Sequence, residues 1–458
     1  MKRALFAMVM VVMTLGAAPA PLPTSTPLPA NTFADGATYV IEVPSNWNGT
    51  LLLYSHGYRF RGSRNPAVDE GSEIADLRPV LLARGYALAG SSYATTGYAV
   101  ADALRDQMST LDEFVRRYGR PKRTIAWGHS LGGLISIGLV ERHPDRFDGA
   151  FSMCGMLAGS ESTWNQLLDS EFIFKVLSNT AASNLLQPAN ITDPDANLRA
   201  AQRVFNDARI TQAGRARLAL AAAFGEEPTW DSATADPPPL PDLNGRIAAM
   251  LKSFEQNVLP AGFGARQELE LRAGGNPSTN VGESYLSAFR TLPQRDLIVN
   301  AYKAAGLDLE ADLRALDATP RIPADPQAAA YLKENTNVGD TLPVPVLTMH
   351  TIADPLIPVE HERNYSEAVP VEVRASHLRQ LFVKRAGHCA FTSAETLVAL
   401  ESLLERMRNG SWSNLDPEDL NESAREYGEG LNSFVSDDRE SAPVPPSFIE
   451  YVPKAFLR

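Results

Sequence analysis

The chain has 458 residues, of which 44% are hydrophobic and 21% charged, and its formal net charge is −12. This composition excludes a disordered or collagen-like chain, and the excess negative charge argues against a nucleic-acid partner because it repels phosphate backbones. With only two cysteines, Cys154 and Cys389, the sequence also excludes a disulfide-rich scaffold and a cysteine-cluster zinc site.

The N-terminal segment predicts export. Lys2 and Arg3 precede an apolar run over residues 4–15, and small residues follow as far as Ala20. This arrangement is typical of a secretory signal peptide, which we place at residues 1–20 with a cleavage site between 18 and 30. The run is shorter than the ~20 residues that span a bilayer, so we expect no stable membrane anchor. The alternative is that the segment is not cleaved and anchors the protein in a membrane. Residues 21–37 are expected to form a flexible lead-in, and the protein to be secreted or periplasmic.

Short apolar runs alternate with amphipathic stretches over residues 38–157. Strands are predicted at 38–43, 51–55, 86–90, 123–127 and 149–153, and helices at 76–84, around 108–118 and at 131–142. Asn48-Gly49 between the first two strands predicts a hairpin. The alternation as a whole predicts an α/β fold, with a parallel sheet flanked by helices.

The alternation stops between residues 158 and 342, where helical periodicity recurs between proline-rich stretches. Helices are predicted at 163–177, 197–209, 214–224, 246–258, 285–305 and 309–316. We interpret residues 158–342 as a helical cap inserted into the sheet domain. Strands resume at 344–350 and 380–384 and a helix follows at 394–408, so the core comprises 38–157 and 343–408, with a C-terminal tail at 409–458.

The sequence Gly128-His129-Ser130-Leu131-Gly132 lies directly between a predicted strand and a predicted helix. A turn this tight strains the backbone of its central residue, and Gly128 and Gly132 are needed because a Cβ atom there would collide with neighbouring backbone. The turn exposes the Ser130 hydroxyl at a helix N-terminus, which favours developing negative charge. Ser130 is therefore the predicted nucleophile, and the alternative is a glycine-rich turn that only packs the helix on the sheet.

A serine hydroxyl needs a base to take its proton. His388 follows the last predicted strand and should lie at the same edge of the sheet as Ser130. Asp354, in the loop after strand 344–350, is the predicted acid that orients the imidazole, with Glu360 as a weaker substitute. The order Ser130, Asp354, His388 along the chain is the one that this architecture requires.

The remaining histidines are assigned structural roles. His350 ends a strand and is expected to be a hydrogen-bonded strand-end residue, and the side chain of His129 should point away from the hydroxyl of Ser130. We expect solvated side chains at His143, His361 and His377. No histidine pair has metal-ligand spacing, so neither a metal nor another cofactor is predicted.

An acyl-transfer site must also stabilise an oxyanion. One donor is predicted to be the backbone N–H of Leu131, directly after the nucleophile. The other is predicted to be the N–H of Tyr58, because His56-Gly57 follows an early strand and Gly57 permits close backbone approach. The alternative for His56-Gly57 is an ordinary strand-end turn.

Two motifs resemble those of the α/β-hydrolase superfamily of serine hydrolases. Gly-His-Ser-Leu-Gly-Gly resembles the lipase and esterase form of its nucleophile elbow, and His56-Gly57 resembles its oxyanion motif. The resemblance covers about residues 30–157 and 343–408. It implies a mostly parallel, eight-stranded sheet with a helical cap over the site. Gly387-His388-Cys389 is also similar to tannase- and feruloyl-esterase-like enzymes, in which cysteines flank the catalytic serine and histidine, although here His129 precedes Ser130.

Cys154 follows the predicted strand beside the nucleophile strand, and Cys389 directly follows the predicted base, His388. Export permits a disulfide between them. We predict that they pair and so connect the cap entrance to the histidine loop; the alternative is two buried free thiols.

Together these features predict an exported serine hydrolase that cleaves small-molecule or polymeric carboxylic esters through an acyl-enzyme. The alternatives are an exported, aminopeptidase-like peptidase or amidase on the same fold, and a non-catalytic binding protein. Acyl specificity and oligomeric state stay open. Four cap aromatics are predicted to pack in the core, with an acyl pocket as the alternative: Trp164, Phe172, Phe174 and Phe254.

Overall fold

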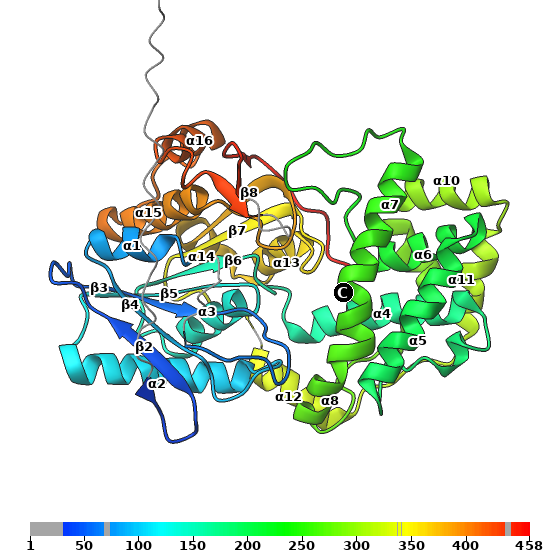
Figure 1. The fold of residues 1–458 in the computed structure, drawn as a ribbon, viewed down its shortest axis with the longest axis horizontal. Helices are drawn as coiled ribbons and strands as arrows, with labels where there is room; N and C mark the ends of the chain where they lie inside the picture. The colour runs from blue at the N-terminus through cyan, green and yellow to red at the C-terminus, as the bar shows by residue number, and fades with distance from the viewer. Residues whose placement is uncertain (1–30, 68–73, 337, 340, 436–440) are drawn as a thin grey trace, which may run out of the picture.

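The computed structural model describes residues 31–67, 74–336, 338–339, 341–435 and 441–458. The predicted signal peptide, residues 1–20, and most of the predicted lead-in lie outside the described residues. Figure 1 shows a sheet with its covering helices beside a purely helical part. None of the helices in the described ranges is both long enough and apolar enough to traverse a bilayer.

The described residues form a nine-stranded mixed sheet with the strand order β1-β2-β4-β3-β5-β6-β7-β8-β11. The six strands from β4 to β8 in that order run parallel, whereas β1, β2 and β11 pair antiparallel at the edges. The predicted α/β class is confirmed, but the sheet of the described residues has nine strands rather than the expected eight, two of which, β1 and β11, are two-residue edge strands. The bounds are β1 Asn31–Thr32, β2 Thr38–Glu42, β3 Thr50–Ser55, β4 Ala87–Ser91, β5 Arg123–His129, β6 Gly149–Met153, β7 Val346–Ala353, β8 Leu378–Ala386 and β11 Phe448–Ile449.

The predicted hairpin at Asn48-Gly49 is wrong. Strand β4 lies between β2 and β3, antiparallel to the first and parallel to the second. The N–H of Asn48 donates to Gly85 O (2.8 Å) and Gly49 O accepts from Lys122 N (2.8 Å), so the turn is held by later segments. A local turn signal is overridden here by the crossover through α1, which brings β4 parallel to β3.

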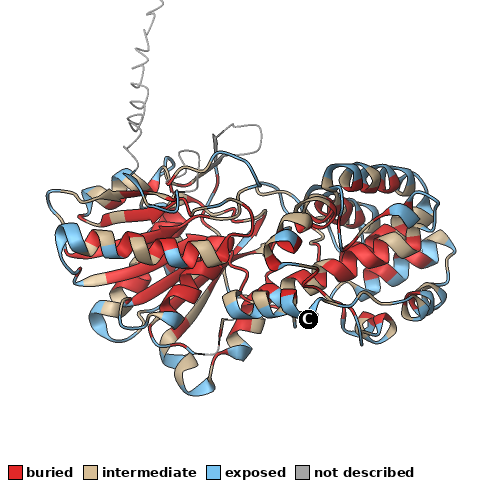
Figure 2. Ribbon diagram, turned by 90° about the horizontal axis from the view of Figure 1, so that it is seen from below, coloured by how far each residue is buried: buried red, intermediate tan, exposed pale blue. Residues whose placement is uncertain are grey.

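Helices cover both faces of the sheet. On β3, Leu51 and Leu53 pack toward α2 and α3, whereas Leu52 and Tyr54 pack toward α1 and α15. Burial on both sides explains why the parallel strands are almost continuously apolar, and Figure 2 shows most of the sheet in the red of buried residues. The helices of this part are α1 Leu77–Ala83, α2 Val100–Tyr118, α3 Leu131–Arg142, α13 Glu360–Ala368, α14 Val371–His377, α15 Ser393–Asn409 and α16 Pro417–Arg425.

Between β6 and β7 the described chain is helical and has a hydrophobic core of its own, which includes Phe174, Phe205 and Phe254. The helix predicted at 285–305 is interrupted near Pro293, which cannot donate a backbone hydrogen bond. Helices α8 and α12 were not predicted. The elements are α4 Ser160–Ser178, η1 Ser183–Leu185, α5 Pro194–Arg209, α6 Gln212–Phe224, α7 Leu243–Ser253, η2 Phe254–Val258, η3 Ala261–Ala265, α8 Arg266–Ala273, α9 Tyr285–Ala288, η4 Phe289–Thr291, α10 Arg295–Ala305, α11 Leu309–Ala318 and α12 Pro326–Thr336.

The tail connects the two parts. After α16 the short strands β9 (Ser433–Val435) and β10 (Ser441–Pro443) pair with each other, and β11 joins β8. The last residues then run to the cap, where the chain ends beside α4 (Figure 1). There Arg458 forms ion pairs with Asp169 (2.6 Å) and Glu283, so charge contacts hold the tail against the helical part.

Candidate active site

Ser130 occupies a strained turn between β5 and α3. Its backbone has φ 56° and ψ −122°, a conformation that non-glycine residues rarely adopt. The Ser130 N–H donates to Met153 O (2.8 Å) on the neighbouring strand, which fixes the turn to the sheet. The predicted sharp strand-to-helix turn is therefore present, with Ser130 at its centre.

The two glycines of the turn are dictated by space. A Cβ atom on Gly128 would lie 2.3 Å from Ser55 O, and one on Gly132 would lie 1.9 Å from the same oxygen. Both distances are far shorter than any van der Waals contact, so the backbone of β3 excludes a side chain at either position.

Gly132→Ala is expected to lower the free energy of unfolding by about 3 kcal/mol or more, because backbone rather than a flexible side chain must move. Gly138→Ala, on the same helix, is the matched control: its nearest contact would be Leu104 Cδ2 at 3.3 Å, and alanine favours the helix. Urea unfolding of both variants measures the difference. Equal stabilities would contradict this account of the turn.

Asp354 and His388 are in direct contact. His388 Nδ1 donates to Asp354 Oδ2 (2.8 Å) and lies 3.0 Å from Oδ1. Oδ1 also accepts the N–H groups of Leu356 and Ile357, both at 2.9 Å, which locks the carboxylate in an Asx turn. Burial alone would raise the pKa of Asp354, but His388 and His350 hold it below its ordinary value. The carboxylate in contact with His388 is thus fixed and ionised.

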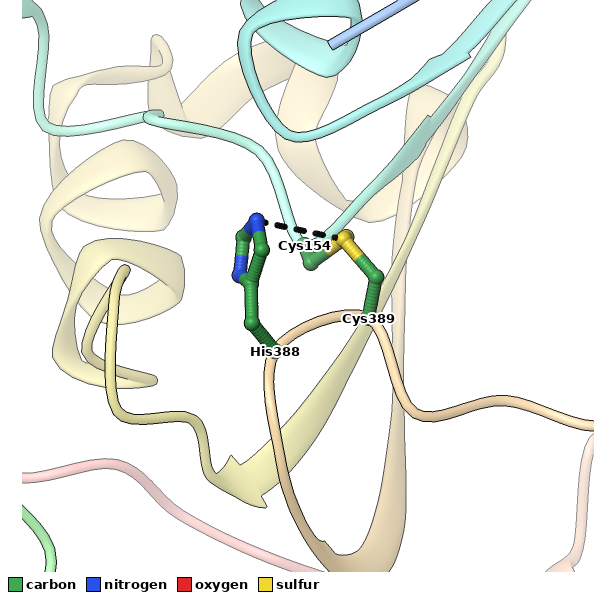
Figure 3. A group of neighbouring side chains, drawn as sticks. All are labelled: Cys154, His388 and Cys389. Atoms are coloured by element: carbon green, nitrogen blue, oxygen red, sulfur yellow. Dashed lines mark hydrogen bonds between the residues drawn. A yellow bond between two sulfur atoms is a disulfide. The ribbon is translucent and has the colours of Figure 1, made fainter. Parts of the chain in front are cut away.

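Ser130 and His388 line the same cavity. Within the described residues Ser130 Oγ makes no hydrogen bond, and His388 Nε2 instead lies 3.4 Å from Cys389 Sγ (Figure 3). Contacts between nucleophile and base are often long in unliganded enzymes and shorten when substrate binds. The structure therefore brings all three predicted residues to one site but shows only the Asp354–His388 contact as a hydrogen bond.

His350 is more than a strand-end residue. It is fully buried on β7, its Nε2 lies 3.6 Å from Asp354 Oδ2, and its Nδ1 lies 3.2 Å from Glu362 Oε1. The prediction of a solvated His361 is wrong, because this residue is fully buried on α13 and its Nδ1 accepts the Ala158 N–H (3.1 Å). His350 and His361 come close to the Asp354 loop because α13 packs beside it. No local sequence pattern indicates this packing.

The loop after β3 lies against the nucleophile. A Cβ atom on Gly57 would be 3.3 Å from Ser130 Cβ. His56 Nδ1 lies 2.7 Å from Gly57 O, which fixes the orientation of the peptide that carries the Tyr58 N–H. Tyr58 and Leu131 both line the cavity, and the oxyanion role of their backbone N–H groups stays a prediction.

The cavity has a volume of about 480 Å³ and lies between the elbow, the His388 loop and the cap. Of the four cap aromatics, Trp164 lines it, whereas Phe172, Phe174 and Phe254 belong to the cap core. The π-helical segments η2 and η3 supply part of its wall. The described lining residues include no lysine or arginine. The buried Glu227 also lines the cavity, and no motif in the sequence points to it.

Cys154 and Cys389 form a disulfide with a Cα–Cα distance of 5.3 Å, which confirms the predicted pairing. The bond joins the end of β6 to the loop that carries His388 (Figure 3). His129 occupies the position before Ser130, where its Nδ1 lies 3.2 Å from the Tyr54 hydroxyl. The sulfur atoms and His388 cluster within 4.8 Å, but disulfide sulfurs lack the thiolate form that binds metals, so this cluster fits a metal ion poorly.

Comparisons place this chain among known proteins. The model of a tannase-like family of unknown function, DUF6351, matches residues 30–355, which include Ser130 and Asp354. The chain is 31% identical over 429 residues to the o-phthalyl amidase of Xanthobacter agilis, with 87% of this chain and 91% of that protein covered.

Two solved structures are also similar. Feruloyl esterase B from Aspergillus oryzae is 14% identical, with a TM-score of 0.38, and 84% of this chain and 80% of that chain are covered. A rice cell wall degrading esterase from Xanthomonas oryzae is 15% identical, with a TM-score of 0.34, and 78% of this chain and 81% of that chain are covered.

Proposed function

The chain belongs to the tannase-like family DUF6351 and is a hydrolase, and we propose that it is an exported serine hydrolase that cleaves carboxylic esters through an acyl-enzyme. The observation that carries this proposal is the Asp354–His388 hydrogen bond at 2.8 Å beside the strained turn that bears Ser130. A base held by a buried carboxylate, at the same cavity as a serine hydroxyl, is what activation of serine requires.

In this mechanism Ser130 Oγ attacks the ester carbonyl carbon while His388 Nε2 takes its proton. The oxyanion that forms accepts hydrogen bonds from the N–H groups of Leu131 and Tyr58. When the tetrahedral intermediate collapses, the C–O bond breaks and His388 returns the proton to the departing alcohol. Water then attacks the acyl-enzyme with His388 as the base, which releases the carboxylic acid and restores the Ser130 hydroxyl.

Export is supported by the signal-peptide pattern of residues 1–20 and by the disulfide, which oxidising compartments preserve. The proposed domain organisation keeps residues 38–157 and 343–408 as the catalytic core, 158–342 as the cap and 409–458 as the tail. Because the cap covers the cavity, a small ester fits it more readily than an unbroken polymer strand.

The second candidate is an amidase, which the relationship to o-phthalyl amidase favours. The same residues suit amide cleavage, provided that His388 protonates the departing nitrogen. A non-catalytic binding protein explains neither the strain at Ser130 nor the fixed carboxylate beside His388.

A panel of chromogenic esters with rising acyl length, each paired with the anilide of the same acid, tests the proposal. The purified protein is expected to hydrolyse esters with kcat/KM at least about 100-fold above the matched anilides, because alcohols leave more easily than amines. A fluorophosphonate probe should label the peptide containing Ser130, as read by mass spectrometry. Turnover confined to anilides would favour the amidase, and absence of both turnover and labelling would refute the proposal.

A further inference from the structure

A second histidine, the fully buried His350, lies against the carboxylate that His388 uses. We propose that His350, clamped by Glu362 as a permanent imidazolium, is a positioning residue that keeps Asp354 ionised and limits how strongly Asp354 attracts a proton onto His388. The proposal rests on the function proposed above, since it concerns the same base. It extends the three-residue arrangement to a row of four charged or chargeable groups, of which the first three are buried and the last is partly exposed to the cavity: Glu362, His350, Asp354 and His388.

The protonation of His350 follows from its partners. Nδ1 faces the carboxylate of Glu362 at 3.2 Å, and Nε2 faces the Ile357 carbonyl at 2.9 Å and Asp354 at 3.6 Å. Carbonyl and carboxylate oxygens accept hydrogen bonds, so both ring nitrogens must donate, and an imidazole donates from both only when it is protonated. The ring is completely buried, so water cannot satisfy either nitrogen instead.

Glu362 is built to hold this cation. Its Oε2 accepts the Thr348 hydroxyl and the Gln380 side-chain N–H (2.6 Å), while Oε1 faces His350. Gln380 also donates to the Glu362 backbone oxygen (2.7 Å), which fixes the start of α13 to β8. Both oxygens of this fully buried carboxylate thus face hydrogen-bond donors, and the carboxylate is placed to pair with a charge on His350.

Titratable groups face His350 from two segments. Among them, burial and the charge of His350 lower the pKa of His361 to about 3, so this neighbour stays neutral, and burial raises the pKa of Glu360 to about 7. Although burial lowers it, the pKa of His350 is raised to about 10 by Asp354 and Glu362. These groups are Asp354 in the loop after β7 and Glu360, His361 and Glu362 on α13, while His388, in the loop after β8, is linked to His350 through Asp354.

The consequence for catalysis is electrostatic. If the only charge beside His388 were the buried Asp354 anion, that anion would stabilise the imidazolium and keep His388 protonated, hence inactive as a base, to a higher pH. The cation on His350 opposes this, and Glu362 moderates it from farther away. His350 does not line the cavity, so its removal should change the acid limb of the pH profile rather than substrate binding.

His350→Gln removes the cation, and the acid limb of its kcat/KM profile is expected to move to higher pH by about one unit, with KM within about two-fold of the wild type. The double variant His350→Gln/Glu362→Gln removes both charges of the pair, leaves no unpaired buried charge, and should recover at least half of that shift. His361→Gln is the matched control, since it removes a buried but neutral histidine from the same shell, and its profile should match the wild type.

An unchanged acid limb in His350→Gln, or an equal shift in His361→Gln, would overturn the proposal. If His350→Gln does not fold, the protonation of His350 in the unaltered protein decides the question in its place. Nitrogen-15 NMR of histidine-labelled wild-type protein gives a readout without activity: His350 should carry two ring protons through pH 9. A neutral His350 at pH 7 would refute the proposal, whereas a protonated His350 in a protein without esterase activity would refute only the proposed function.

Discussion

Replacing Ser130 with alanine is expected to lower kcat for ester hydrolysis by about 10⁴-fold or more, because the bond-forming oxygen is lost. Alanine is smaller than serine and meets the same positive φ, so the turn and the fold should persist. Steady-state and burst kinetics on one chromogenic ester measure the loss, and thermal unfolding checks that stability changes by less than about 1 kcal/mol. Residual activity would come from the oxyanion donors and the cavity alone.

The matched variants are His388→Gln and Asp354→Asn. Because the three residues act as one unit, the double variant Ser130→Ala/His388→Gln should lose scarcely more activity than Ser130→Ala itself. Independent contributions that multiply in the double variant would contradict a shared mechanism. A Ser130→Ala protein that keeps more than about 1% of wild-type kcat would place the nucleophile elsewhere.

The candidate site was predictable where its chemistry is local in the sequence. Ser130 lies in a motif whose glycines are required because Ser55 O leaves no space for a Cβ atom. The residues on either side of the motif have clear strand and helix patterns, which correspond to β5 and α3. Asp354 and His388 are far apart along the chain, but each follows a parallel strand, and parallel strands end at one edge of a sheet. Their hydrogen bond therefore follows from strand order.

The remainder depends on contacts that no local pattern encodes. His350 and Glu362 meet because α13 packs beside β7 and β8, and either residue alone in the sequence suggests only a buried or a surface position. The hairpin at Asn48-Gly49 failed for the same reason, since β4 takes the place beside β3. Glu227 enters the cavity because Glu226, with φ 55°, turns the chain back after α6. Such left-handed residues are hard to recognise when they are not glycine.

The disulfide should matter for rate as well as for stability. It closes a segment of 235 residues, so its removal is expected to lower the free energy of unfolding by about 2–5 kcal/mol. It also lies next to the base: Cys389 follows His388 in the chain, and both cysteines have positive φ, so the bond holds a loop in a conformation that an unlinked chain rarely adopts.

In the double variant Cys154→Ala/Cys389→Ala, kcat is expected to fall by about 100-fold while KM changes little, because a small displacement of His388 from the nucleophile has a large effect on rate. Assays well below the melting temperature, with near-UV circular dichroism as a check of folding, separate this effect from unfolding. In the wild type, activity should fall in parallel with the appearance of two alkylatable thiols during titration with a phosphine reductant. A folded double variant with wild-type kcat would show that the disulfide stabilises the protein but does not affect the rate. Packing and the Asp354 hydrogen bond would then be enough to hold His388 in place.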